Sequence, residues 1–317
     1  MGIEIGGTKL QLGLGAGDGT ITALWRGSVN PAEGGDGIRR AIIAAVPVLL
    51  TKATLDRRAL RGVGIGFGGP TDDATQTVIK SHHIAGWDHF PLRDWISDLL
   101  GGIPAVLCND ADVAGLAEAL FGAGKGLSPI FYITAGTGVG GGLIIDGKIY
   151  RGAGRGAAEI GHLRPVYPLD PAAGHDEILE YYAAGWGIAR AARDWEKRGD
   201  DVSGIRRVAG SGEMTGRVVA EAAHGGDPTA RAILDEAVQA LAEGVCSVIK
   251  LLCPRRVIIG GGLSLIGEEF WFKPIRKYVA ERGMAALAGL TDIVPAALGE
   301  EVVVHGALAL ARHKLGG

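Results

Sequence analysis

The sequence feature that most constrains the fold is a glycine-rich turn between two apolar segments. Residues 130–145 read Ile-Phe-Tyr-Ile-Thr-Ala-Gly-Thr-Gly-Val-Gly-Gly-Gly-Leu-Ile-Ile, and the aromatic and β-branched residues of the first segment favour a strand. Glycine lets a ligand approach the backbone closely, and Thr134 and Thr137 add hydroxyl groups. Such a turn suits a phosphate. A tight β-hairpin whose glycines serve only geometry explains an isolated turn equally well.

Two more glycine clusters follow strand-like segments. Residues 2–14 repeat the order of strand, glycine turn and strand, which indicates an internal duplication. Residues 260–262 are three glycines that follow the apolar run 257–259 and precede a predicted helix. Three glycine turns at strand ends indicate one nucleotide held between two related halves.

A series of short motifs extends over nearly the whole chain. They are Glu4-Ile-Gly-Gly-Thr-Lys9, Phe67-Gly-Gly-Pro70, Gly86-Trp87, Asn109-Asp110-Ala111, Glu118 with Gly122-Ala-Gly124, Gly136-Thr-Gly-Val-Gly-Gly141, Asp146-Gly147, Glu159-Ile-Gly-His162, Glu180 and Gly260-Gly-Gly262. In this order they resemble the ROK family of sugar kinases, repressors and relatives, within the actin and hexokinase-like ATPase superfamily. Each motif alone is weak, and the combination is specific.

The resemblance implies an α/β fold of two ribonuclease-H-like (actin-like ATPase) domains with a cleft between them. We expect residues 1–109, completed by a C-terminal helix at 305–317, to form the first domain. Residues 110–304 are expected to form the second, with a hinge near Asn109.

The apolar periodicity predicts several helices. One spans residues 38–50, with Asp36 as its N-cap and with Pro47 bending or ending it. Others cover residues 91–100, 111–121 and 305–314. The clearest begins after the cap residue Asp227, has Pro228 at its first position and continues to Leu252.

Composition restricts the partners and the compartment. The 317 residues include 32 basic and 35 acidic ones, for a net charge of −3 without long runs of one sign. We therefore expect neither a nucleic acid nor a membrane as partner. Cys108, Cys246 and Cys253 assemble neither a disulfide framework nor a zinc site. A cytoplasmic location is expected, and the resemblance implies a homodimer.

Asp110 is the candidate catalytic base. A hydroxyl that attacks a γ-phosphate needs orientation and a proton acceptor, and a carboxylate at a strand end provides both. From local sequence alone, Asn109 or Asp110 acting only as a helix cap is favoured, and Asp112 is a competing carboxylate. The resemblance implies that Asn109 and Asp110 bind the sugar and that Asp110 is catalytic.

The resemblance also assigns the other ligands. Glu159, His162 and Glu180 are expected to bind sugar hydroxyls together with Gly69, although local sequence alone favours a solvated helix residue for Glu180 and a loop histidine for His162. ATP is expected to bind to a set that comprises Gly6, Gly7, Thr8, Lys9, Thr134, Gly136, Thr137, Gly138, Gly261 and Gly262.

Three departures from the family pattern affect these expectations. Glu4 stands where an Asp usually faces Mg²⁺ through water, so the metal geometry is open. His83 replaces a sugar-facing Asn. Residues 163–179 contain no cysteine, whereas many members have a cysteine-rich zinc knot there. Since His162 and His175 alone make a weak site, we expect no zinc and a loop held by packing around residues 165–171.

The expected activity is ATP- and Mg²⁺-dependent phosphorylation of a hexose, with the 6-hydroxyl of glucose first. Fructose, which is supported by Glu4, and N-acetylmannosamine are the alternative substrates. A sugar-sensing protein without catalytic activity is the alternative of another class. Only Met1 to Ile3 precede the first motif, which disfavours a repressor with an N-terminal helix-turn-helix.

Overall fold

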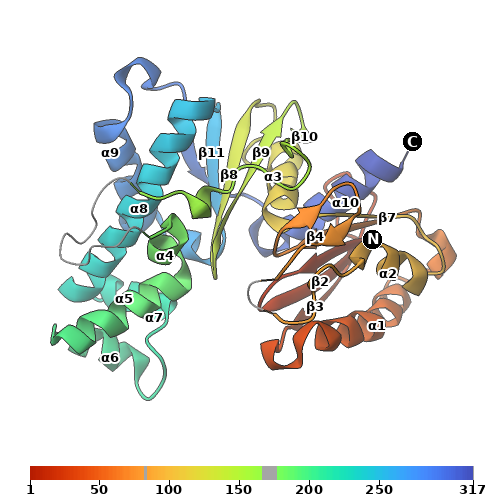
Figure 1. Cartoon of the computed structure of the whole chain (residues 1–317), viewed down its shortest axis with the longest axis horizontal. Helices are drawn as coiled ribbons and strands as arrows, with labels where there is room; N and C mark the ends of the chain where they lie inside the picture. The colour runs from red at the N-terminus through yellow and green to blue at the C-terminus, as the bar shows by residue number, and fades with distance from the viewer. Residues whose placement is uncertain (82–83, 166–176, 317) are drawn as a thin grey trace. The chain divides into compact units, whose positions relative to one another are not determined.

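The computed structural model describes residues 1–81, 84–165 and 177–316, and the chain packs into two compact units. Unit 1 comprises residues 1–132, 142–158 and 296–317, and unit 2 comprises residues 133–141 and 159–295. Figure 1 shows the whole chain, coloured from red at the N-terminus to blue at the C-terminus. The expected hinge near Asn109 concerns motion, and it stays a prediction.

Unit 1 is built on a sheet with the strand order β3-β2-β1-β4-β7. β1 pairs antiparallel with β2 and parallel with β4, and β4 pairs parallel with β7. The inner strands are buried and mainly apolar, as expected for strands covered on both faces, with Glu4 and Gln11 as buried polar residues. The bounds are β1 (Gly2–Ile5), β2 (Lys9–Leu14), β3 (Ala23–Ser28), β4 (Val63–Phe67) and β7 (Ala105–Asn109). A small hairpin of β5 (Thr71–Asp72) and β6 (Thr77–Val78) follows β4.

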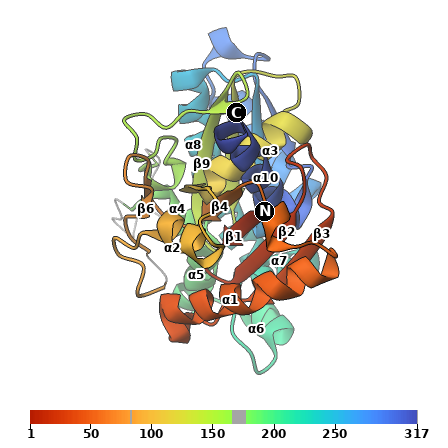
Figure 2. The ribbon, with the colours of Figure 1, turned by 90° about the vertical axis from the view of Figure 1, so that its right-hand side faces the viewer.

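Helices cover both faces of this sheet. α1 (Gly34–Lys52) and α2 (Leu92–Leu99) lie on one face, and α3 (Asp110–Phe121) and α10 (Val302–Leu315) lie side by side on the other, as Figure 2 shows. A Cβ atom on Gly64 of β4 would lie 1.8 Å from the carbonyl oxygen of Ala307. Only glycine therefore allows α10 to pack this closely on the sheet.

The start and the end of α1 differ from the prediction. Asp36 lies in the first turn and is not the N-cap, because a 3-10 helix at Pro31–Glu33, capped by Asn30, leads directly into α1. Pro47 lies inside the helix and does not end it. Pro47 faces solvent, so water can satisfy the carbonyl group that loses its partner, while Val46 and Leu49 keep the opposite face in the core.

The second sheet repeats the arrangement of the first. Its order is β10-β9-β8-β11-β12, with β10 antiparallel to β9 and β11 parallel to β12. The glycine turn between β8 and β9 thus corresponds to the one between β1 and β2, as the predicted duplication requires. The bounds are β8 (Ile130–Ala135), β9 (Val139–Ile145), β10 (Lys148–Ile149), β11 (Arg256–Gly260) and β12 (Asp292–Pro295).

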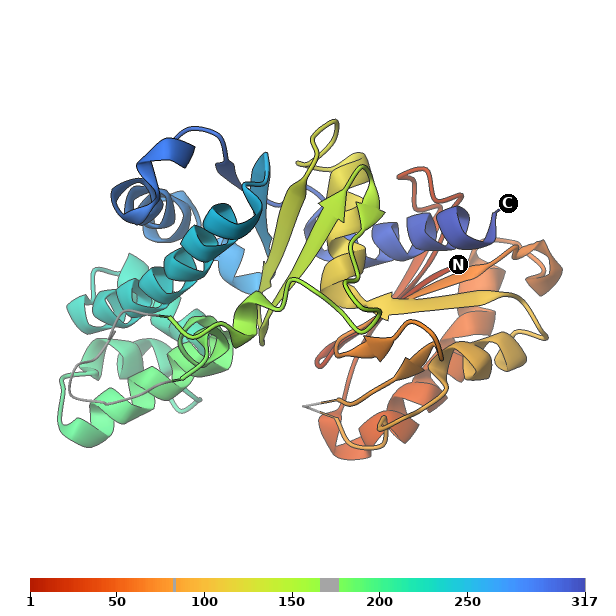
Figure 3. The same ribbon diagram turned by 45° about the horizontal axis from the view of Figure 1, so that its top comes forward.

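Unit 2 carries the remaining helices, with α8 at their centre (Figure 3). α8 (Pro228–Leu252) contacts α4, α5, α7 and α9. Its predicted cap is confirmed, because the Asp227 side chain accepts a hydrogen bond from the Ala230 N–H. The other bounds are α4 (Leu179–Ala183), α5 (Gly185–Arg198), α6 (Ser203–Ala209), α7 (Gly216–His224) and α9 (Lys273–Arg282). Among the described helices, none has the length and apolarity that crossing a bilayer requires.

Candidate active site

The first glycine turn lies at the end of β1 in unit 1. The Gly6 N–H donates to the Lys9 carbonyl at 2.9 Å, which closes the turn, and Thr8 is exposed at its tip. The Lys9 ammonium contacts the Glu4 carboxylate at 3.0 Å and the Glu300 carbonyl at 2.9 Å. The turn is therefore closed by its own backbone and braced by a lysine that reaches the segment before α10.

Glu4 is a buried carboxylate, with only 5% of its surface exposed. Burial raises the pKa of Glu4 to about 7, against the opposing effect of Lys9. One of its oxygens, Oε2, is buried and has no hydrogen-bond partner among the described residues. An uncompensated carboxylate oxygen beside the predicted phosphate turn fits a divalent cation or one of its water ligands.

Asn109 and Asp110 lie where β7 passes into α3. The Asn109 side-chain oxygen accepts the N–H of Ala111 at 2.9 Å, and its amide nitrogen donates to the Gly69 carbonyl at 3.1 Å. Oδ1 of Asp110 also accepts the Ala111 N–H, at 2.8 Å. The capping role of Asn109 is thus confirmed. The same contacts hold Gly69 beside Asn109, as a shared sugar-binding role requires.

The Asp110 carboxylate lies close to the first glycine turn. A Cβ atom on Gly68 would lie 3.3 Å from Oδ2 of Asp110 and 3.5 Å from Cα of Gly6, so Gly68 fills the short distance between them. Gly68 also donates its N–H to the Ile5 carbonyl at 2.8 Å. Unit 1 therefore places the predicted base next to the predicted phosphate turn.

Asp112, the competing carboxylate, has a different role. It is 1% exposed and forms an ion pair with Arg151, whose guanidinium also contacts Asp73 at 2.8 Å and the Thr71 carbonyl at 3.1 Å. Arg151 thereby ties the first turn of α3 to the segment after Gly69. Sequence reasoning missed this residue, since its partners lie 39 and 78 positions away and no local pattern marks it.

The second glycine turn joins β8 to β9 in unit 2. The Gly136 N–H donates to the Gly138 carbonyl at 2.9 Å, and the Gly136 carbonyl accepts the N–H of Gly185 at 2.8 Å. A Cβ atom on Gly261 would lie 2.4 Å from the Ala135 carbonyl oxygen. Thr137, Gly261 and Gly262 are exposed. The glycines predicted to bind the nucleotide in this unit thus expose backbone, which fits the phosphates and sugar of a nucleotide.

The predicted sugar ligands of unit 2 differ in their surroundings. Glu159 precedes the 3-10 helix Ile160–His162 as its N-cap residue, and His162 is the last residue of that helix. Their side chains are 56% and 61% exposed, with 3.6 Å between the imidazole and the carboxylate. Glu180 is instead half-buried, and its carboxylate accepts the Val139 N–H at 2.8 Å. It is therefore not the solvated helix residue that local sequence favours.

Some predictions fall outside the described residues. These are His83, His175 and most of the loop after Pro165. Within the described ranges, no group of three or more His, Cys, Asp and Glu side chains is arranged to hold a metal ion. The absence of zinc stays a prediction, and elemental analysis of protein purified without added metal would overturn it by finding one zinc per chain.

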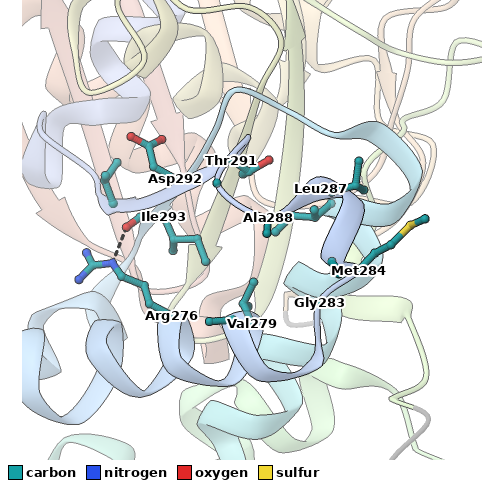
Figure 4. A pocket seen from close by; sticks show the side chains of 14 residues that line it. Arg276, Val279, Gly283, Met284, Leu287, Ala288, Thr291, Asp292 and Ile293 are labelled. Atoms are coloured by element: carbon teal, nitrogen blue, oxygen red, sulfur yellow. Dashed lines mark hydrogen bonds between the residues drawn. The ribbon is translucent and has the colours of Figure 1, made fainter.

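A cavity of about 510 Å³ lies elsewhere in unit 2, between α9, the segment 283–291 and β12 (Figure 4). Val279, Met284 and Leu287 are among the apolar residues that line it, and Arg276 donates to the Ile293 carbonyl at 2.7 Å. All the predicted site residues lie in other parts of the described chain.

Comparison with solved structures identifies the fold. The crystal structure of a ROK family glucokinase from Streptomyces griseus in complex with glucose and AMPPNP matches with a TM-score of 0.80 and 32% identity, covering 98% of each chain. This match confirms the predicted α/β fold class, that of the actin-like ATPases.

The sequence comparisons identify the family. The ROK family profile matches residues 1–314, so the chain belongs to the ROK family. A glucokinase from Thermotoga maritima is 32% identical over 320 residues, which cover 100% of this chain and 98% of that protein. A glucokinase from Halalkalibacterium halodurans is 30% identical, with coverage of 96% and 92%.

Proposed function

We propose that this protein is an ATP-dependent glucokinase that transfers the γ-phosphoryl group of ATP to the 6-hydroxyl of glucose. The observation that carries the proposal is the position of Asp110, which directly follows β7 and whose carboxylate, like the first glycine turn, lies close to Gly68. A base for the attacking hydroxyl and a cradle for the phosphates are thus adjacent in unit 1. The full-length similarity to glucokinases supports glucose as the acceptor.

In the proposed reaction Asp110 accepts the proton of the 6-hydroxyl as the oxygen attacks the γ-phosphorus. The bond from the γ-phosphorus to the β,γ-bridging oxygen breaks, and ADP leaves with that oxygen. Asn109 and Gly69 position the sugar in unit 1, and Glu159, His162 and Glu180 bind further hydroxyls. The backbone of the two glycine turns, with Thr8, Lys9, Thr134 and Thr137, binds the phosphates, and Gly261 and Gly262 contact the adenosine.

Mg²⁺ is the metal that we assign to this reaction, and it supplies charge neutralisation on the phosphates. Glu4 is the residue that would hold it through water, since its Oε2 has no partner among the described residues. We also propose that the enzyme acts in the cytoplasm, where ATP is available, and as a homodimer. Size-exclusion chromatography with light scattering measures the oligomeric state.

A coupled ATP assay over glucose, mannose, fructose, N-acetylglucosamine and N-acetylmannosamine, ranked by kcat/KM, tests the proposal. We expect glucose to rank first, because a polar site rejects analogues whose hydroxyls cannot pair. A tenfold preference for fructose or an N-acetylated sugar would contradict the glucose assignment and leave the kinase assignment intact. If no sugar supports ADP release, a sugar sensor replaces the kinase.

A further inference from the structure

The carboxylate of Glu180 lies directly against the second glycine turn. Its Oε2 accepts the N–H of Val139, the first residue of β9, at 2.8 Å. A Cβ atom on Gly138 would lie 2.7 Å from the same oxygen, so glycine at this position leaves room for the carboxylate. A predicted sugar ligand therefore takes part in holding the predicted nucleotide turn.

The segment that begins at Glu180 also contacts the other end of the turn. The carbonyl of Glu180 accepts the N–H of Ala184 at 3.0 Å, and the next residue, Gly185, donates its N–H to the Gly136 carbonyl at 2.8 Å. The turn from Gly136 to Val139 is thus hydrogen-bonded at both ends by one short segment. A displacement of this segment must change the geometry of the turn.

The second sugar-binding segment rests on the same residue of the turn. A Cβ atom on Gly161, which lies between Glu159 and His162, would be 2.1 Å from the Val139 carbonyl oxygen. The backbones of the two sugar-binding segments are joined by a hydrogen bond from the Leu179 N–H to the Leu163 carbonyl at 2.7 Å. Val139 therefore contacts both segments, one through its N–H and the other through its carbonyl.

We propose that Glu180 couples the binding of sugar to the binding of nucleotide, with Oε2 holding the Val139 N–H and Oε1 accepting a sugar hydroxyl. This inference rests on the proposed function. Oε1 has no donor within the part of the chain that the structure describes, and a carboxylate can accept several hydrogen bonds at once. A sugar that fixes this side chain also orders the turn, so the nucleotide binds a surface that is already organised.

Isothermal titration with AMPPNP, in the absence and presence of saturating glucose, measures the coupling without turnover. We expect glucose to lower the Kd of AMPPNP by about fivefold or more, which is the usual lower range for coupled sites. AMPPNP should lower the Kd of glucose by the same factor, because the coupling is reciprocal.

Three variants separate coupling from simple loss of a ligand. Glu180→Ala should bring the coupling factor close to one, while Glu180→Gln, which keeps an acceptor oxygen, should restore part of it. Gly138→Ala should push the Glu180 carboxylate away from the glycine turn. It should therefore lower the coupling factor while the carboxylate that binds the sugar is still present. The control Glu159→Ala should weaken glucose binding and keep the coupling factor, since the Glu159 side chain is 56% exposed and lies against His162, at 3.6 Å.

A coupling factor near one in the wild-type protein would overturn the inference. So would a coupling factor equal to the wild-type value in both Glu180→Ala and Gly138→Ala. Either result leaves the kinase proposal standing, because turnover in the sugar panel is measured separately. If Glu180→Ala binds glucose too weakly for titration, Gly138→Ala decides. Absence of sugar phosphorylation would instead refute the proposed function, whatever the coupling factor.

Discussion

The carboxylate of Asp110 is the group on which the proposed phosphoryl transfer most directly depends. Asp110→Asn keeps an oxygen that can accept the Ala111 N–H but removes the proton acceptor. We expect kcat to fall by at least about a hundredfold and the glucose Kd to change much less. Steady-state kinetics and titration check this, with Asp98→Asn on the exposed side of α2 as the matched control. Near-normal turnover of Asp110→Asn would show that another group is the base.

The Glu4 carboxylate should make stability depend on pH. Burial raises the pKa of Glu4 from 4.5 to about 7, so between these values the folded protein holds a proton that the unfolded chain releases. The contribution of Glu4 to stability should be fully present below pH 4.5 and should be lost as pH rises to about 7, by about 3 kcal/mol at about 1.36 kcal/mol per pKa unit. Above pH 7 this contribution should be constant.

Urea unfolding of metal-free protein between pH 5 and pH 7.5 measures this effect. The Gln side chain in Glu4→Gln cannot titrate. The unfolding free energy of this variant should therefore decrease less between pH 5 and pH 7.5 than that of the wild type. Parallel pH profiles of the two proteins would mean that Glu4 ionises in its ordinary range.

At the scale of elements, Glu118 joins α3 to the segment that leads into α10. Its side chain is completely buried and accepts three backbone N–H groups, from Ala123 at 2.7 Å and from Ala297 and Leu298 at 2.9 Å each. This segment also contains Glu300, whose carbonyl accepts a hydrogen bond from the Lys9 ammonium. Glu118 therefore supports the first glycine turn from a distance.

We expect Glu118→Gln to lower the free energy of unfolding by about 2 to 3 kcal/mol, because a charge-assisted acceptor is lost and a buried donor is left without a partner. The KM for ATP should rise more than the KM for glucose, since Lys9 loses its support. Urea unfolding and steady-state kinetics measure the two effects. Glu281 on α9 has a side chain that is 61% exposed and serves as the control. The unfolding free energy of Glu281→Gln should stay within about 0.5 kcal/mol of the wild-type value. Equal changes in the KM for ATP and the KM for glucose would mean that Glu118 stabilises the fold and does not support the first glycine turn in particular.

At the scale of the whole molecule, the predicted sugar ligands are divided between the two units. Gly69, Asn109 and Asp110 belong to unit 1, and Glu159, His162 and Glu180 belong to unit 2. One hexose bound by both sets would restrain the units against each other. Small-angle scattering should therefore show a smaller radius of gyration with saturating glucose than without it, and an unchanged profile would contradict a shared sugar site.

Local sequence was sufficient for most of the backbone. The apolar run before Gly136 predicted a strand, the pair Asp227 and Pro228 predicted the start of α8, and both are present. Pro47 shows the limit of such reasoning. Whether a proline ends a helix depends on the side to which the lost hydrogen bond faces, and this is decided by packing.

By itself, the sequence determined the strands, the glycine turns, their duplication and the family, because these depend on residue type and on spacing over a few positions. Only the tertiary structure decided the partners of Arg151, Glu118 and Glu180. The hydrogen bond from Val139 to Glu180 spans 41 positions, and the one from Ala297 to Glu118 spans 179. Periodicity reports which face of an element is buried, whereas a carboxylate finds its donors only when distant segments are packed together.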